Sequence, residues 1–573
     1  MSKPESFWDH PYLRTQLIAY IGNKRALLPF LGELFRERGL KRGLKRGGNR
    51  GLSTPRFLDP FAGSGAVSRL AKYLGFAVVA GDWECYSYVI NRAHLGVDPT
   101  ELAGLFSEYG GIDALLSELN GLYPGNGVLP GGGHEPPAGP LPPGWPAYIA
   151  RHYAPAATES ADYRRERLFY TRENALFIDA VRNRIEELYP GSVDSAGPEK
   201  ALLLASLLYQ AATHANTSGV FKAHHKGFGG HGGDALGRIL RPMVLQSPVL
   251  YDGAARAEVR RSEAERLARG RSFEVAYLDP PYTGHQYGSN YFMLNTIARW
   301  DKPPVPEERG SDGRFKEKAG IRSDWRRTRS AYCYRGSAPE ALRRLVDSID
   351  AGRIYLSYNT EGIIPFEELI DIMESRGRVE LFLKDYTVYR GGKQSIRRAT
   401  RNAELVLLVT TNEAPRPRDR RRIEEIRLLQ EVQTLLHGRF VPEKLRSVQL
   451  EGVDLETAHG YRITRVVPPV EELTVEVLET LRDALDAARV GDHFEEITVL
   501  GGLLSGTDLP PPTSREYQRR VLWCLRKFSF RRYRAQFEEA EALLRDVLDE
   551  APEELPILRS GLEIEVARAG LRM

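Results

Sequence analysis

Short apolar runs that end in polar or glycine-rich turns recur along much of this chain of 573 residues. Five such runs have the length and apolar content expected of buried strands, and they lie at residues 56–59, 77–80, 275–278, 353–358 and 404–410. Helical spacing of apolar residues appears between several of these runs, over residues 20–38, 66–74 and 87–95. Strands that alternate with helices predict an α/β fold.

Two long stretches depart from this alternation. The first, residues 101–269, contains a piece rich in proline and glycine (124–146) and helical patterns at 160–188 and 200–212. Beyond residue 413 the pattern is mostly that of amphipathic helices. We therefore expect one α/β domain in two parts, residues 11–100 and 270–413, with residues 101–269 inserted between them. Residues 414–573 are expected to form a mainly helical region.

The composition is that of a large globular enzyme. The formal net charge is only +4, so any nucleic-acid-binding face must come from local clustering of basic residues. Cys85, Cys333 and Cys524 lie too far apart to suggest a disulfide framework or a metal site. The first residues lack an apolar signal core, and no run of about 18 apolar residues is present. We expect a cytoplasmic protein with no metal and no membrane association.

The most informative motif is Asp279-Pro280-Pro281-Tyr282, which follows the predicted strand 275–278. The strand must end there because two prolines cannot donate to a sheet ladder. The motif presents a carboxylate, a backbone carbonyl and an aromatic ring. A planar substrate with an exocyclic amine suits these groups, because the oxygens can accept the amine hydrogens while the ring stacks on the plane.

A second motif, Asp59-Pro-Phe-Ala-Gly63-Ser-Gly65, follows the predicted strand 56–59. Its glycines allow a ligand to approach the backbone at the carboxyl end of a strand, where α/β sheets bind ligands. The third glycine of the dinucleotide fingerprint and the lysine of the P-loop are both missing. Asp82 ends the next strand, in the usual place for an acid that holds a ribose diol. The predicted ligand is a nucleoside without a pyrophosphate.

With a third motif near the N-terminus, Tyr20-Ile-Gly-Asn-Lys24, the chain resembles the D12-type class of DNA N6-adenine methyltransferases. The resemblance covers roughly residues 11–100 and 270–412, and it rests on the three motifs in this order. It implies a Rossmann-like class I methyltransferase fold with an inserted target-recognition domain. It also implies S-adenosyl-L-methionine as the cofactor and double-stranded DNA as the partner.

The resemblance assigns a role to each motif position. Tyr20 and Lys24 would lie near the methionine end of the cofactor, Asp59 near its amino group and Asp82 at its ribose. The cofactor turn would consist of Pro60, Phe61, Ala62, Gly63, Ser64 and Gly65. The target base would be held by Asp279, Pro280, Pro281 and Tyr282.

Three loops combine basic residues with aromatics or glycines, a pattern that suits contact with a phosphate backbone. Solvated surface charge explains them equally well. The residues we single out are Lys222, Lys226, Arg326, Arg327, Tyr389, Arg390, Lys393 and Arg397. Arg322 adds to the basic character of the second loop. The first loop also holds several histidines, but no carboxylate or cysteine is spaced to complete a metal site.

The expected function is the transfer of a methyl group to adenine N6 of a flipped-out base at a specific DNA sequence. A restriction-modification or phage-defence system would provide the context, with a cognate restriction endonuclease as a further candidate partner. Cytosine N4 and a base amine in RNA are alternative acceptors, and a DNA-binding scaffold without catalysis is a third class. For residues 414–573, a DNA-binding module and a partner-docking module remain open.

Overall fold

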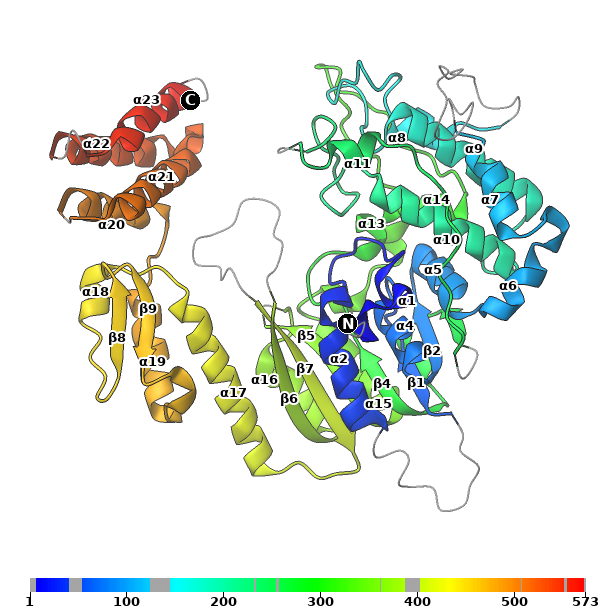
Figure 1. Ribbon diagram of the computed structural model, residues 1–573, viewed down its shortest axis with the longest axis horizontal. Helices are drawn as coiled ribbons and strands as arrows, with labels where there is room; N and C mark the ends of the chain where they lie inside the picture. Colours follow the sequence, from blue (N-terminus) through cyan, green and yellow to red (C-terminus); the bar gives the residue numbers. More distant parts are fainter. Residues whose placement is uncertain are drawn as a thin grey trace, which may run out of the picture. The chain divides into compact units, whose positions relative to one another are not determined.

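The computed structural model describes residues 7–40, 54–123, 145–230, 233–253, 257–360, 362–386, 402–506, 508–550 and 554–570. The chain folds into two units (Figure 1). The first comprises Met1–Lys384 with Leu405–Pro415, and the second comprises Asp385–Glu404 with Arg416–Met573. Tyr389, Arg390, Lys393 and Arg397, which the sequence predicts to bind nucleic acid, lie outside the described residues.

The first unit is built on a seven-stranded sheet with the order β3-β2-β1-β4-β5-β7-β6. Its strands are β1 (Arg56–Asp59), β2 (Ala77–Asp82), β3 (Glu258–Arg261), β4 (Ser272–Leu278), β5 (Asp350–Asn359), β6 (Gly377–Tyr386) and β7 (Asn402–Thr411). The strands from β3 to β5 pair in parallel. Thr411, at the end of β7, hydrogen-bonds the carbonyl oxygen of Ala351, at the start of β5, so β7 runs the opposite way.

Helices cover this sheet as the alternating sequence pattern requires. On one face, apolar side chains of α1 (Pro11–Arg14), α2 (Leu28–Leu34) and α4 (Ala66–Tyr73) form a core with residues of β1, β2 and β4. Further helices of the α/β part are α5 (Cys85–Leu95), α12 (Ala264–Ala268), α15 (Ala338–Ser348) and α16 (Phe366–Glu374). The order of the strands reverses between β1 and β4, which is where such sheets bind ligands. The Rossmann-like prediction is confirmed.

The insert is helical and shares a core with the α/β part. Its helices are α6 (Pro99–Leu105), α7 (Ile112–Asn120), α8 (Tyr148–Tyr153), α9 (Arg172–Leu188), α10 (Pro198–Thr213) and α11 (Leu236–Leu240). Apolar residues of α6 to α10 pack with α5, α13 (Tyr287–Asn290) and α14 (Phe292–Arg299), around which these helices gather in Figure 1. The predicted helix 160–188 begins only at Arg172, because the Thr171 side chain caps it by accepting from the Asn174 N–H.

The second unit confirms the prediction of a mainly helical C-terminal region. A first core joins α17 (Pro417–Leu436), α18 (Pro442–Arg446) and α19 (Val475–Ala488) to an antiparallel hairpin of β8 (Asp454–Ala458) and β9 (Arg462–Val467). The sequence pattern did not indicate this hairpin. A second core lies among α20 (His493–Gly506), α21 (Pro511–Phe528), α22 (Arg534–Glu550) and α23 (Pro556–Gly570). No helix in the described ranges is long and apolar enough to cross a membrane.

The turn between β1 and α4 depends on Gly65, which precedes the helix with a left-handed backbone (φ 82°). A Cβ atom at Gly65 would lie 2.5 Å from Oδ1 of Asn91. The Asn91 side chain is buried and fixed, because its amide donates to the carbonyl oxygens of Gly63 and Ser87. The turn is therefore restricted both by its backbone conformation and by the space around it.

We expect Gly65→Ala to destabilise the fold more than Gly75→Ala. Gly75 has a similar left-handed backbone (φ 90°), but a Cβ atom there would have no neighbour within 4 Å, so only backbone strain of about 1–2 kcal/mol applies. At Gly65 the clash should add roughly 1–3 kcal/mol. Chemical denaturation of both variants measures the difference, and equal losses would show that Asn91 moves aside freely.

Candidate active site

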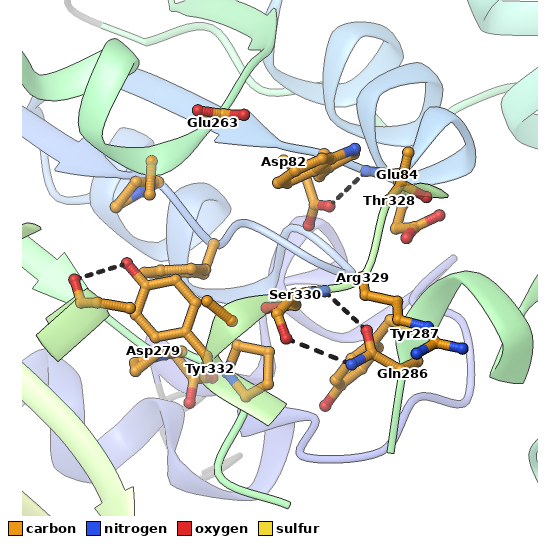
Figure 2. A pocket seen from close by; sticks show the side chains of 18 of the residues that line it. Asp82, Glu84, Glu263, Asp279, Gln286, Tyr287, Thr328, Arg329, Ser330 and Tyr332 are labelled. Atoms are coloured by element: carbon orange, nitrogen blue, oxygen red, sulfur yellow. Dashed lines mark hydrogen bonds between the residues drawn. The ribbon is translucent and has the colours of Figure 1, made fainter. Parts of the chain in front are cut away.

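A cavity of about 310 Å³ opens where the parallel strands end (Figure 2). Its walls come from the segments that follow β1, β2, β3 and β4, together with Tyr20–Gly22 and residues 328–332. A smaller cavity of about 30 Å³ shares Tyr20, Phe61 and Asp279 with it. All three predicted motifs therefore meet at one place, although they are far apart in the sequence.

An ion pair joins the first motif to the last. Nζ of Lys24 lies 3.0 Å from Oδ1 of Asp279, with the lysine side chain 4% exposed. The same Nζ atom lies 5.3 Å from the centre of the Tyr282 ring. Lys24 begins a short 3-10 helix, which the Asn23 side chain caps by accepting from the Arg25 N–H. The family resemblance assigns Lys24 to the cofactor, but its observed partner is the carboxylate that follows β4.

The loop after β4 is held from its outer side. The Tyr282 carbonyl oxygen accepts a hydrogen bond of 3.1 Å from the Ile363 N–H. Its ring lies edge-on to that of Tyr358 on β5, with centres 5.7 Å apart. Pro280 and Pro281 carry no backbone N–H, so this strand end presents carbonyl and carboxylate oxygens without backbone donors between them.

Tyrosine side chains fix the N-terminal segment against α13. The ring of Tyr20 stacks on that of Tyr291, with centres 4.8 Å apart. The Tyr291 hydroxyl accepts from the Ile21 N–H at 2.7 Å, and the Tyr287 hydroxyl donates to the Ile21 carbonyl at 3.1 Å. Burial raises the pKa of Tyr20 well above its ordinary value, so the ring stays neutral. A Cβ atom on Gly63 would lie 2.9 Å from the Tyr20 ring, so this tyrosine closes directly over the glycine turn.

Asp82 organises the turn at the end of β2. Its two carboxylate oxygens accept from the backbone N–H groups of Gly63, at 2.9 Å, and Glu84, at 2.8 Å. Figure 2 shows Asp82 and Glu84 on the same wall of the cavity. Burial raises the pKa of both acids, that of Glu84 to about 7.

Asp59 is the most deeply buried acid of the three motifs. Its Oδ2 atom accepts from the Ser68 hydroxyl at 2.6 Å, whereas Oδ1 has no hydrogen-bond partner among the described residues. Burial raises the pKa of Asp59 to about 7, and the negative charges of Asp279 and Asp82 contribute. This inner part of the site is therefore rich in carboxylates, which favours a ligand with positive charge and hydroxyl groups over a phosphate-bearing one.

Two parts of the cavity wall were not singled out from the sequence. Trp83, which follows Asp82 directly, lines the cavity and is 40% exposed. Residues 328–332 reach the cavity because the Gln286 amide bonds both the N–H of Ser330, at 2.8 Å, and its carbonyl oxygen, at 3.3 Å (Figure 2). The exposed tryptophan could have been flagged from its position after a strand end, but the tether to a distant backbone leaves no sequence pattern.

The structure describes four of the residues that were predicted to bind nucleic acid, and all four lie on the surface. Lys222 and Lys226 are exposed on a segment that docks on α13 through a hydrogen bond from the Phe221 N–H to the Asn290 carbonyl. Arg326 and Arg327 are exposed in the short helix η5 (Ser323–Arg327).

Arg322, just before η5, is different from these residues. It is 4% exposed and forms ion pairs with Asp301 and Asp324. It therefore anchors the segment in the protein and is not available for DNA.

Comparison with known proteins identifies the class of enzyme. The family model of D12 class N6 adenine-specific DNA methyltransferases matches residues 20–123 and 147–313. The type II methyltransferase M.NlaIII of Neisseria lactamica is 30% identical over 352 residues, which is 61% of this chain and 89% of that protein. The chain belongs to the D12 class of N6 adenine-specific DNA methyltransferases, as its motifs indicated, and is an adenine-specific DNA methyltransferase.

Other relatives agree with this class. The modification methylase LlaI of Lactococcus lactis subsp. lactis is 28% identical over 407 residues, or 69% of this chain and 56% of LlaI. The type II methyltransferase M.CviAII of Paramecium bursaria Chlorella virus 1 is 25% identical over 374 residues, or 65% of this chain and 93% of that protein. No solved structure matched the chain.

The raised pKa of Asp59 predicts a pH-dependent stability. An unfolded aspartate loses its proton near pH 4, whereas folded Asp59 does so at about pH 7. Between these values the folded state binds more protons, so the contribution of Asp59 to stability falls as the pH rises from about 4 to about 7. Asp59→Asn should remove this pH-dependent loss of stability, because asparagine does not titrate. Its stability relative to wild type should rise by roughly 2–4 kcal/mol across this range, as measured by denaturation at each pH. A difference that stays constant with pH would contradict this assignment.

Proposed function

We propose that the protein transfers the methyl group of S-adenosylmethionine to N6 of an adenine rotated out of duplex DNA. The observation that carries the proposal is the Asp279 carboxylate, paired with Lys24 at the end of β4, in the same cavity as Asp82 at the end of β2. Asp279 would accept hydrogen bonds from the exocyclic amine of a base, and Asp82 would bind the hydroxyls of a cofactor ribose.

The residues around the smaller cavity fit the cofactor. The free Oδ1 atom of Asp59 suits the ammonium group of a methionine moiety, and Tyr20 and Lys24 line the same space. Asp82, which ends β2 and lines the main cavity, suits the ribose hydroxyls. The turn supplies close backbone contact through Pro60, Phe61, Ala62, Gly63, Ser64 and Gly65. S-adenosylmethionine, when bound, supplies a methyl group on a positively charged sulfur, which matches the surrounding carboxylates.

The loop after β4 would prepare the amine to attack. Adenine N6 is a weak nucleophile because its lone pair is delocalised into the ring. Hydrogen bonds from the amine to Asp279 and to the Pro280 carbonyl would favour a pyramidal nitrogen with an available lone pair, and Pro281 would keep the loop rigid. Face-to-face stacking on Tyr282 would contribute about 1–3 kcal/mol. Positioning and electrostatics then account for most of the acceleration, and the proton can leave after methyl transfer.

Base rotation and DNA binding need surfaces outside the cavity. Extruding a paired base costs a few kcal/mol. Lys222, Lys226, Arg326 and Arg327 are exposed, and they would offset part of this cost by contacting phosphates. Burial, and to a smaller extent the positive charge of Lys222, lowers the pKa of His285, which follows the Asp279–Tyr282 loop in the sequence. This supports Lys222 as a candidate phosphate contact.

The biological context we propose is modification within a restriction-modification or phage-defence system, in the cytoplasm, where chromosomal DNA is accessible. The relatives named modification methylases support it. A cognate restriction endonuclease would be the partner. Cytosine N4 carries a geometrically similar amine and is the alternative acceptor.

Asp279→Asn should lower the rate of methyl transfer by at least roughly 1,000-fold while cofactor binding persists, because the amine loses a charged acceptor. The matched control is Asp350→Asn, at the opposite end of the sheet where β5 begins, which should keep nearly wild-type rates. Single-turnover transfer to DNA and calorimetric titration of the cofactor measure the two properties. Wild-type transfer by Asp279→Asn would refute the assigned role.

Lys222→Gln/Lys226→Gln should weaken DNA binding about equally for all sequences. It should also reduce the salt slope of the affinity by about 1–2, because each lysine would neutralise one phosphate. Arg184→Gln is the control, since Arg184 is already paired with Glu118 and Glu187 on the insert. Affinity measured by fluorescence anisotropy over a salt series tests this, and an unchanged slope would mean that both lysines are merely solvated.

A further inference from the structure

A basic surface lies on α21 and the turn after it, in the second unit. From Pro511 to Arg534 the sequence holds eight arginines and lysines against one acid, Glu516. This density contrasts with the formal charge of +4 for the whole chain. Positive charge concentrated along one helix is characteristic of nucleic-acid-binding surfaces.

The basic residues and the buried apolar residues of α21 lie on different sides of the helix. Its buried face, formed by residues such as Tyr517, Val521 and Leu525, packs among α20, α22 and α23. Arg515, Arg519, Trp523 and Arg526 recur at helical spacing on the other side, and all four are exposed. We call these four residues, with Phe530 and Arg531 beyond the helix, the α21 face.

Part of this charge is already neutralised. Arg520 makes a two-point ion pair with buried Glu496, at 2.8 and 2.9 Å, and Arg526 shares Glu565 with Arg568. By contrast, Arg515, Arg519 and Arg531 form no ion pair with any residue in the described ranges. These three arginines are the uncompensated part of the α21 face.

Trp523 packs against two basic side chains next to the α21 face. Its ring lies 4.0 Å from the guanidinium of Arg520 and 4.0 Å from Nζ of Lys527, and edge-on to His493. It nevertheless stays 37% exposed, as does Phe530. Because Arg520 is already paired with Glu496, Lys527 is the cation that this ring adds beside the α21 face.

The dimensions of the α21 face fit a DNA backbone. Arg515 and Arg526 are eleven residues apart on a continuous helix, which corresponds to about 16 Å. At a rise of 3.4 Å per base pair, that length covers about five base pairs. An extended array of cations fits such a regular row of phosphates.

We propose that the α21 face binds the phosphate backbone of the DNA substrate, as a second contact separate from the methyl-transfer cavity. The inference rests on the proposed function, which supplies DNA as the partner. It decides between the two roles left open for residues 414–573 in favour of DNA binding. The contact would add affinity without reading sequence, because phosphates carry no base information.

The test uses the full chain with Arg515→Gln/Arg519→Gln/Arg531→Gln and mixed-sequence duplex DNA. We expect the salt slope of binding to fall by about 2–3 and the affinity at moderate salt to fall roughly 10- to 100-fold. The rate of methyl transfer at saturating DNA should stay at the wild-type value. The control, Arg446→Gln/Arg465→Gln/Arg545→Gln, removes the same charge from arginines of the second unit that are paired with glutamates, and should bind nearly as wild type does.

The outcomes are distinguishable. Wild-type affinity and slope in the α21-face variant, with an unchanged thermal transition, would overturn the proposal and leave an acidic protein as the partner of this face. An equal loss in the control would also overturn it, because net charge alone would then explain the effect. If the wild-type protein binds DNA through this face but transfers no methyl group, the proposed function fails and the inference about the surface stands.

Discussion

The ion pair between Lys24 and Asp279 is the interaction on which the site depends. It joins the N-terminal segment to the loop after β4 at 3.0 Å, with the lysine side chain buried and the aspartate side chain 18% exposed. A buried ammonium group such as that of Lys24 is costly unless a negative charge compensates it, and removing one partner of such a pair leaves the other uncompensated. The pair therefore fixes the position of the acid that we assign to the amine, and it links the smaller cavity, which Lys24 lines, to the main cavity, which Asp279 also lines.

The remaining carboxylates explain why this sheet suits a methyl donor. Asp59 and Asp82 lie at the ends of neighbouring strands, and burial raises the pKa of both. A site in which acids are crowded and partly desolvated gains from a ligand that brings positive charge and hydroxyl groups. A pyrophosphate would meet the same acids with repulsion. In the function we propose, the cofactor occupies the same strand-end position as in dinucleotide-binding proteins, but without a pyrophosphate.

Local features were predictable from the sequence and long-range pairings were not. The strand ends at Asp59, Asp82 and Asp279 could be located because each aspartate ends or follows an apolar run. Asp59 and Asp279 are followed by proline, and Asp82 is preceded by a glycine. The partner of Lys24 could not, since ion pairs between distant segments leave no periodicity. Arg322 belonged by composition to a basic loop, yet two aspartates bury it as an anchor. The hairpin of β8 and β9 was missed because its strands are short and largely polar.

The central claim is best tested by identifying the methylated product. Radiolabelled S-adenosylmethionine would be incubated with the protein and mixed-sequence duplex DNA, and in parallel with total RNA, and the digested nucleosides would be separated. The account predicts N6-methyladenine in DNA and no label in RNA. Label in N4-methylcytosine would contradict the assigned base. Label in RNA alone, or no transfer despite bound cofactor, would contradict the claim that this cavity methylates DNA.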